Sequence, residues 1–210
     1  VKRIRFTTSH PNEMNDHLID CFGNIKKLAN HLHLPIQSGS DKVLMAMKRN
    51  YTTLEYKSII KKLRKKLPNV SLTTDLIIGF PTETTNDFNL TKKLFIELDF
   101  DYSFSFIYSK RPGTPAAYLK DETTDVEKLE RLREIQSLNI KQGECYTKKM
   151  IGTTHRVLID HFSKKKPGVL LGKTDNNRII EFKDSKDLLN KFVNVKVMKI
   201  LGKSLVGELV

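Results

Sequence analysis

Short β-rich segments alternate with longer stretches of helical periodicity along the first two thirds of the chain. In each helical stretch the apolar residues recur every three or four positions, which is typical of amphipathic helices. Serial strand–helix units predict a parallel sheet with right-handed crossovers, in which ligands bind at the carboxyl ends of the strands. The four predicted strands are Arg3 to Phe6, Leu32 to Leu34, Ser71 to Ile78 and Tyr102 to Tyr108.

The helices between these strands are marked by their apolar stripes and by capping residues. A helix is expected over residues Asn15 to Asn30, since Leu18, Phe22, Ile25 and Leu28 fall at helical spacing. A second helical stretch is expected from Lys42 to Met47. Further helix starts are predicted at Thr52 with Glu55, at Thr84, and at Thr124 with Glu127, two of them capping boxes.

Beyond Gly152 the pattern changes to short β-like runs separated by turns. The runs are Arg156 to Asp160, Val169 to Leu171, Ile179 to Phe182, Val193 to Ile200 and Leu205 to Val210. Closely spaced short strands of this kind predict a small all-β module. We therefore expect two domains, residues 1–146 and 147–210.

The net charge of the chain indicates what class of partner it binds. The 210 residues contain 37 Lys and Arg against 24 Asp and Glu, a formal net charge of +13. From residue 147 onward the count is 14 against 6, so the small module carries a charge of +8. This balance favours a nucleic acid as partner. Lysine richness that reflects only genome composition is the open alternative.

The chain shows no sign of a membrane or secretory segment. No window approaches the ~18 consecutive apolar residues of a membrane helix, and the first residues, VKRIRF, lack the apolar core of a signal peptide. We expect a cytoplasmic protein. Because a strand is predicted within a few residues of Val1, we also expect a piece of a longer chain.

The two cysteines, Cys21 and Cys145, are far apart and form no CxxC pair. They are expected to be reduced thiols within helices, since neither has the spacing of a metal site. His31 and His33 lie on the same side of a strand, but no Asp, Glu or Cys beside them completes a set of metal ligands. A metal site is therefore not expected.

Polar residues near the ends of the predicted strands are candidates for ligand binding. Ser9 follows the first strand, and Gln37 follows the second. Asp75 interrupts an apolar strand, so its carboxylate needs a partner or a ligand. Gly79 then allows a tight turn or a close approach to a ligand.

Two further loops carry basic side chains. Lys110 and Arg111 stand in a loop that two prolines and a glycine make stiff. They could hold a phosphate or carboxylate, although a rigid connection with solvated charges is an equal alternative. In the β module, Asn176, Asn177 and Arg178 join two strands. A plain hairpin is one interpretation, and contact of these side chains with RNA bases and phosphates is the other.

Several of these segments together resemble the tRNA methylthiotransferase family. The matching runs are RIRFTTSHP, HLPIQSGSDKVLMAMKR, TTDLIIGFPTET, FSFIYSKRPGTPAA and GKTDNNRIIEF, in family order along the whole chain. The resemblance implies an α/β fold, with the last four strand–helix units of a partial radical-SAM (β/α) barrel followed by an RNA-binding TRAM barrel.

The resemblance also implies cofactors and candidate ligands. Members use S-adenosylmethionine (SAM) and two 4Fe-4S clusters, whose cysteine ligands this chain lacks, so no catalytic residue or metal ligand is assigned. By position, the candidates for SAM binding are Ser9, His33, Gln37, Asp75 and Tyr108, and those for substrate binding are Arg111, Asn176, Asn177 and Arg178. The radical-SAM pattern GxIxGxxE is matched poorly, since Asp75 replaces its first glycine and Glu83 falls one residue late.

The activity implied is the conversion of N6-isopentenyladenosine beside the anticodon of tRNA to its 2-methylthio derivative, by a monomer. The 210 residues alone are expected to be inactive. A sister activity on threonylcarbamoyl-adenosine and a non-catalytic RNA-binding module are alternatives. A hydrolase or P-loop protein is not indicated, because neither GxSxG nor GxxxxGK[ST] occurs.

Overall fold

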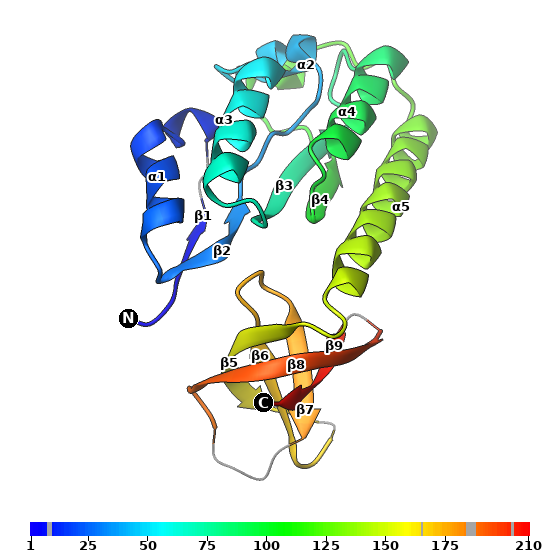
Figure 1. The fold of residues 1–210 in the computed structure, drawn as a ribbon. Coiled ribbons are helices and arrows are strands. Elements are labelled where there is room, and N and C mark those ends of the chain that lie inside the picture. Colours follow the sequence, from blue (N-terminus) through cyan, green and yellow to red (C-terminus); the bar gives the residue numbers. More distant parts are fainter. Residues whose placement is uncertain (8–9, 165, 184–187, 203) are drawn as a thin grey trace. The chain divides into compact units, whose positions relative to one another are not determined.

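The computed structural model describes residues 1–7, 10–164, 166–183, 188–202 and 204–210. The chain forms two compact units, Val1–Gln142 and Gly143–Val210. Figure 1 shows the first as a layer of helices on a sheet and the second as a small barrel.

The first unit contains a parallel sheet whose strands follow one another in space in the order of the sequence. This arrangement confirms the predicted serial strand–helix units. The strands are β1 (Ile4–Thr7), β2 (Leu28–His33), β3 (Ser71–Ile78) and β4 (Tyr102–Ile107).

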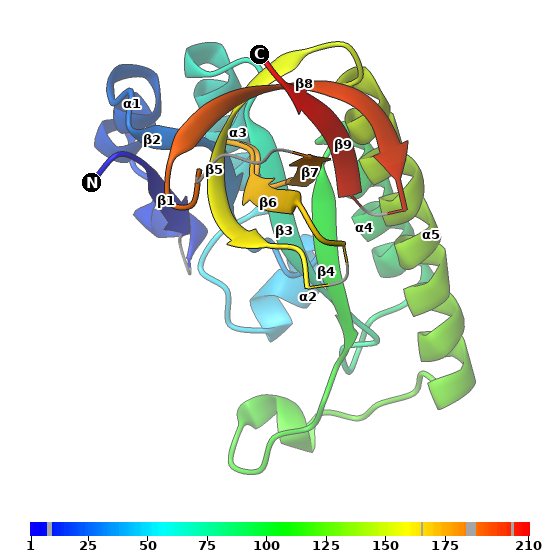
Figure 2. The same ribbon diagram turned by 90° about the horizontal axis from the view of Figure 1, so that it is seen from below.

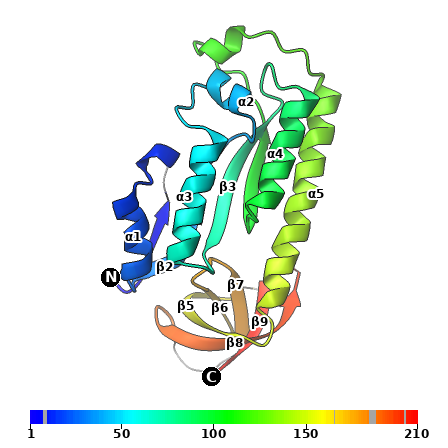
Figure 3. The same ribbon diagram turned by 45° about the horizontal axis from the view of Figure 1, so that its top comes forward.

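Helices lie along one face of this sheet, as Figure 3 shows for α1, α3, α4 and α5. Between them and the sheet lies one apolar core that includes Leu72, Leu76, Ile60, Phe95 and Ile135. The helices are α1 (Asp16–Asn24), α2 (Asp41–Ala46), α3 (Thr53–Lys66), α4 (Thr85–Glu97) and α5 (Asp125–Lys149), with short 3-10 turns η1 (Pro11–Glu13) and η2 (Pro115–Tyr118).

The predicted helix starts are found where the capping residues placed them. Thr52 and Glu55 form a reciprocal capping box, and Thr84 forms another with Asp87. At the start of α5 the Thr124 N–H donates to Glu127 Oε2 at 2.9 Å, and the Glu127 N–H donates to Thr124 Oγ1 at 3.2 Å.

The helix expected over Asn15 to Asn30 was predicted too long. Asn15 does cap α1, but the helix ends at Asn24, and Leu28 begins β2. Gly23 and Asn24 are poor helix formers, and Leu28 pairs with Ile4 of β1. The second strand therefore begins four residues before Leu32, and Leu28 packs against the core from a strand.

In the second unit five strands close into a barrel in the order β5-β6-β7-β9-β8. Of the strand pairs formed by the described residues, only β7–β9 is parallel. Figure 2 shows this unit from below. The strands are β5 (Thr154–Phe162), β6 (Val169–Lys173), β7 (Ile179–Lys183), β8 (Phe192–Leu201) and β9 (Ser204–Leu209), each overlapping a predicted run.

The barrel has its own core, built from residues such as Val157, Ile159, Phe182 and Val195. Gly172 lets two strands approach closely, because a Cβ there would lie 2.4 Å from the Leu158 carbonyl oxygen. Among the described residues, no helix is both long enough and apolar enough to cross a membrane.

Candidate functional site

The carboxyl ends of the four parallel strands meet at one edge of the sheet, and most of the predicted SAM-binding residues lie there. His33 is the last residue of β2, and Tyr108 follows β4 directly. Asp75 is the fifth of eight residues in β3. It is nevertheless level with the loop after β2, because the Gln37 N–H donates to its carbonyl oxygen at 2.9 Å. Ser9 lies outside the described residues.

A chain of polar side chains crosses from β2 to β3. Thr73 Oγ1 is 3.0 Å from His33 Nδ1 and 3.3 Å from His31 Nε2, so both imidazoles share one hydroxyl. His33 Nε2 lies 3.4 Å from Asp75 Oδ1. The partner expected for Asp75 is therefore His33. Both side chains remain partly open to solvent, at 20% and 29% of their full exposure, so a ligand can reach them.

Gln37 is held in an unusual backbone conformation, with φ of 73°. A non-glycine residue in this region costs about 1–2 kcal/mol, so the surrounding structure must hold it there. The Ile36 N–H donates to Thr74 Oγ1, and the Gln37 carbonyl accepts from the Ile77 N–H, both at 2.9 Å.

The rest of this loop is fixed to helix α4. Thr91 Oγ1 accepts from the Gly39 N–H at 2.9 Å. A Cβ on Gly39 would lie 2.5 Å from the Thr91 Cα, so only glycine fits at this distance. One turn earlier on α4, Asp87 Oδ1 accepts from the Ser40 hydroxyl at 2.6 Å.

Asp87 also binds the loop after β3. Its Oδ2 accepts from the Thr84 N–H at 2.9 Å, from the Thr84 hydroxyl at 2.6 Å and from Lys42 Nζ at 3.3 Å. Burial alone would raise the pKa of Asp87, but the hydrogen bonds from Ser40 and Thr84 outweigh it and lower the pKa to about 2. The carboxylate therefore joins the loops of two neighbouring strands.

Helix α5 packs on the same β3 loop. Gly79 has φ of 67°, and a Cβ there would lie 2.4 Å from the Lys128 Cγ. Glu83 Oε1 accepts from the Gly79 N–H at 3.1 Å and from Arg131 Nη1 at 2.8 Å. Burial raises the pKa of Glu83 despite these donors.

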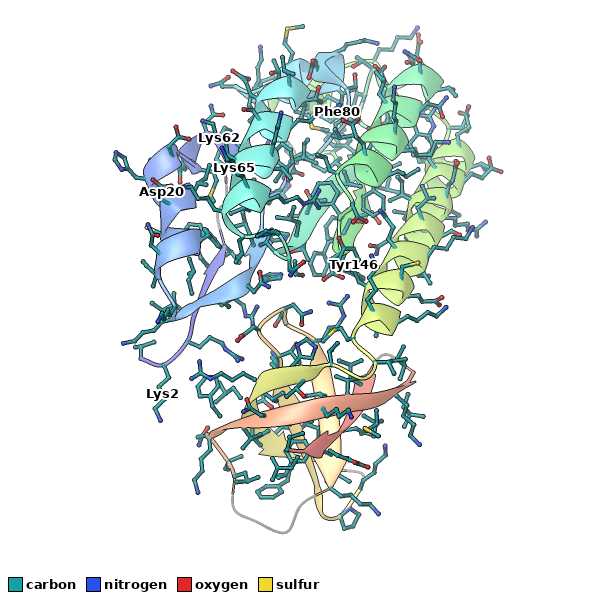
Figure 4. The ribbon with its side chains drawn as sticks, in the orientation of Figure 1. Lys2, Asp20, Lys62, Lys65, Phe80 and Tyr146 are labelled. Carbon is teal, nitrogen blue, oxygen red and sulfur yellow. The ribbon has the colours of Figure 1, made fainter. Side chains whose placement is uncertain are left out.

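Two buried oxygen atoms near this edge have no hydrogen-bond partner within the described part of the chain. One is Tyr108 Oη. The Tyr108 ring contacts the ring of Phe80 at 5.0 Å between centroids, and Phe80 is labelled in Figure 4. The other is Glu83 Oε2. Since buried polar groups in folded proteins are almost always paired, both atoms fit a site that a polar ligand completes.

Arg49 was not singled out from the sequence. It lies in a shallow hollow of about 460 Å³ together with Lys42, Met45 and Tyr51. The residue is half-buried, and no hydrogen bond or ion pair to its guanidinium is seen within the described residues. Its preceding residue, Lys48, has φ of 59°. A half-buried arginine without a carboxylate partner suits an anionic group of a ligand.

The predicted substrate-binding residues lie in two places. Arg111 is exposed in the turn after β4, where its carbonyl accepts from the Thr114 hydroxyl at 2.8 Å. Asn177 adopts φ of 66° in the turn between β6 and β7, as the hairpin interpretation requires.

The other two residues of that turn contact the end of α5 within the second unit. Arg178 Nε donates to Thr147 Oγ1 at 3.3 Å, and its guanidinium lies 5.9 Å from the ring centroid of Tyr146, labelled in Figure 4. Asn176 Nδ2 donates to Met150 Sδ at 3.4 Å. Both side chains therefore hold the turn in place.

The described residues do not furnish an iron–sulfur site. They contain no group of three or more His, Cys, Asp or Glu side chains placed to hold a metal ion. Cys21 and Cys145 are both free thiols. The polar atoms at this edge do suit SAM. The unpartnered Tyr108 hydroxyl can share a hydrogen bond with a hydroxyl group of SAM, and the partly exposed Asp75 carboxylate can accept one from its ammonium group.

Comparison with known proteins supports two domain types. Residues 1–95 match the Radical SAM superfamily, and residues 148–210 match the TRAM domain. Among solved structures, coproporphyrinogen III oxidase (HemN) from Escherichia coli, described as a Radical SAM enzyme, aligns with a TM-score of 0.56 at 19% identity. The alignment covers 83% of this chain and 46% of that one, and it shows the same fold.

Curated relatives match the whole chain at higher identity. Proteins named tRNA-2-methylthio-N(6)-dimethylallyladenosine synthase are 54% identical in Methylobacillus flagellatus, 51% in Nitrosospira multiformis and 49% in Cellvibrio japonicus. The matches cover 99–100% of this chain but only 44–48% of those proteins. The chain thus spans about half the length of these relatives and is similar to them along its own whole length.

Proposed function

We propose that this chain supplies SAM-binding and tRNA-binding parts of an enzyme that forms 2-methylthio-N6-dimethylallyladenosine in tRNA. The observation that carries the proposal is identity of 49–54% along the whole chain to relatives of that name. The polar edge of the parallel sheet supports it. A monomer acting in the cytoplasm belongs to the same proposal.

In this proposal His33, Gln37, Asp75 and Tyr108 bind SAM at the carboxyl edge of the sheet. Ser9, which lies outside the described residues, is included by its position in the sequence. Arg49 adds a guanidinium for the SAM carboxylate. The bound SAM, with the clusters of a protein of the relatives' full length, would supply the radical, sulfur and methyl chemistry. The role of this chain's residues is to hold and orient the cofactor and to exclude water from it.

Binding of tRNA is assigned to the second unit, with Arg111 of the first as a further phosphate contact. The charge of +8 on residues 147–210 supports this assignment, and the TRAM match is consistent with it. We propose that the turn between β6 and β7 contacts the RNA through Asn176, Asn177 and Arg178. Of these three, Asn177 is exposed.

The SAM site is tested by replacing Tyr108 with Phe, which removes only the buried hydroxyl. If Oη binds the cofactor, the dissociation constant for SAM, measured by calorimetry on the 210-residue chain, rises about tenfold. The melting temperature stays the same or rises, because the hydroxyl has no hydrogen-bond partner to lose among the described residues.

Tyr102→Phe is the matched control, since this tyrosine is exposed at the other end of β4. It should leave the affinity for SAM unchanged. Equal affinities of the wild type and the Tyr108 variant would remove Tyr108 from the site. A chain that binds tRNA but no SAM would favour the non-catalytic RNA-binding module.

The substrate is tested in cells that lack the gene for the full-length protein. Mass spectrometry of their tRNA should show loss of 2-methylthio-N6-dimethylallyladenosine and accumulation of the unmodified precursor. An unchanged level of this nucleoside, with loss of 2-methylthio-threonylcarbamoyl-adenosine instead, would establish the sister activity.

A further inference from the structure

The outer surface of the barrel between β5 and β8 combines an aromatic ring with basic and amide side chains. Along β8, Val195 and Val197 are fully buried in the barrel core. Strand residues alternate between faces, so Phe192, Asn194 and Lys196 lie on the outside. This outward row lies far in sequence from the turn at residues 173–178.

Strand β5 adds to the same surface. Its Arg156 is paired in register with Asn194, and its Thr154 with Lys196. Arg156 is exposed, and its guanidinium carbon lies 4.1 Å from the centroid of the Phe192 ring. We call the surface formed by Arg156, Phe192, Asn194 and Lys196 the β5–β8 face.

The β5–β8 face differs from the turn at residues 173–178 in how its side chains are engaged. In the turn, Asn176 and Arg178 contact the end of α5, and Asn176 Oδ1 also accepts from the Thr174 hydroxyl at 2.5 Å. On the β5–β8 face, Asn194 and Lys196 are exposed and project outward from a regular strand. A rigid strand presents contact residues with a fixed spacing.

We propose that the β5–β8 face binds an unpaired nucleotide of RNA, with its base stacked on the Arg156–Phe192 pair and its phosphate near Lys196. Aromatic rings and guanidinium groups stack on any exposed base, and an amide such as Asn194 can bond a base edge. Double-stranded RNA buries its base faces, so the face should prefer single strands. This inference rests on the proposed tRNA binding and specifies which surface performs it.

The stacking part is tested with two conservative variants of the 210-residue chain. Phe192→Leu keeps an apolar side chain but removes the ring, and Arg156→Lys keeps the charge but removes the planar group. The probe is a labelled single-stranded oligoadenylate of about eight nucleotides. We expect Phe192→Leu to raise the dissociation constant about tenfold and Arg156→Lys to raise it less. Neither variant should change the salt dependence of binding, because neither changes the charge.

The phosphate part is tested with Lys196→Gln. The slope of log affinity against log salt should become less steep by about 0.7, the loss of one phosphate contact on a single strand. Lys183→Gln is the matched control, because Lys183 is an exposed lysine on β7, outside the β5–β8 face. Melting temperatures of all four variants are measured alongside.

Three results would overturn the proposal for the β5–β8 face. The first is that the Phe192 and Arg156 variants bind the oligonucleotide as tightly as the wild type. The second is that a duplex of equal length binds as tightly as the single strand. In either case tRNA binding by the chain would still stand. A wild-type chain that binds no RNA at low salt would remove both the face and the proposed tRNA binding.

Discussion

Two side chains on α4, Asp87 and Thr91, hold the loop that carries Gln37. They stand one helical turn apart and accept hydrogen bonds from Ser40 and Gly39. Since Gln37 has a left-handed backbone conformation, a neighbouring anchor is needed to keep it there. The affinity for a ligand at Gln37 should therefore depend on residues that never touch the ligand.

Asp87→Asn tests this anchor through its pH dependence. Because the pKa of Asp87 is lowered to about 2, its ionised form stabilises the folded chain above the unfolded pKa near 4. At pH 7 we expect the variant to be less stable by about 1–3 kcal/mol. The difference should shrink as the pH falls from about 4 toward 2, in urea unfolding at each pH. A difference independent of pH would contradict the assigned ionisation.

Thr91→Val isolates the other half of the anchor, because it removes the hydroxyl and keeps the shape. Amide hydrogen exchange of residues 37–40 should become faster, and SAM affinity should fall. Thr91→Ser should restore both. Leu94→Ala, a buried change on the same helix, controls for general loss of stability. If it speeds exchange of the loop equally, the anchor is not local.

At the scale of elements, two glycines differ in how closely a neighbouring helix packs against them. Gly39 lies against the backbone of α4, where a Cβ would meet the Thr91 Cα. Gly23 lies within α1, where a Cβ would meet Lys66 at an ordinary 3.6 Å. The loop–helix contact at Gly39 thus depends on the absence of a side chain, whereas the contact between α1 and α3 at Gly23 does not.

Replacing each of these glycines with alanine should give opposite results. Gly39→Ala should destabilise the chain by about 1–3 kcal/mol, since the helix backbone cannot move aside. Gly23→Ala should stabilise it by about 0.5–1 kcal/mol through better helix propensity. Thermal and urea unfolding measure both. A neutral Gly39→Ala would mean that the loop and α4 separate easily.

Sequence periodicity and capping residues predicted most of these elements, because both signals are local. The serial strand–helix pattern gave the parallel sheet, and Thr52 and Thr84 gave helix starts. The end of α1 was missed because Leu28 fits a helical stripe and a strand equally well. Asp87 and Arg49 were missed because their roles depend on residues that only the fold brings near.

At the scale of the whole molecule, the chain has two separate apolar cores, one in each unit. Leu63 is fully buried in the first core and Ile159 in the second. No described residue belongs to both cores, so each core should respond to its own substitutions.

Leu63→Ala and Ile159→Ala test this separation. Each should cost about 2–5 kcal/mol in the unit that contains it. Hydrogen exchange in urea should show protection lost within residues 1–142 for the first variant and within 143–210 for the second. Loss of protection throughout the chain in either variant would show that the units unfold together.

The two sheets differ in what they offer to other chains. The barrel closes on itself, but the parallel sheet ends at β4, beyond which no further strand is paired in the described part of the chain. Phe104 and Phe106 on that strand are exposed. An open ladder with aromatic side chains is a template for aggregation. The first unit is therefore the part of this chain that is prone to aggregation. Replacing Phe106 with Lys should reduce aggregation at high protein concentration, measured as a lower intensity of scattered light.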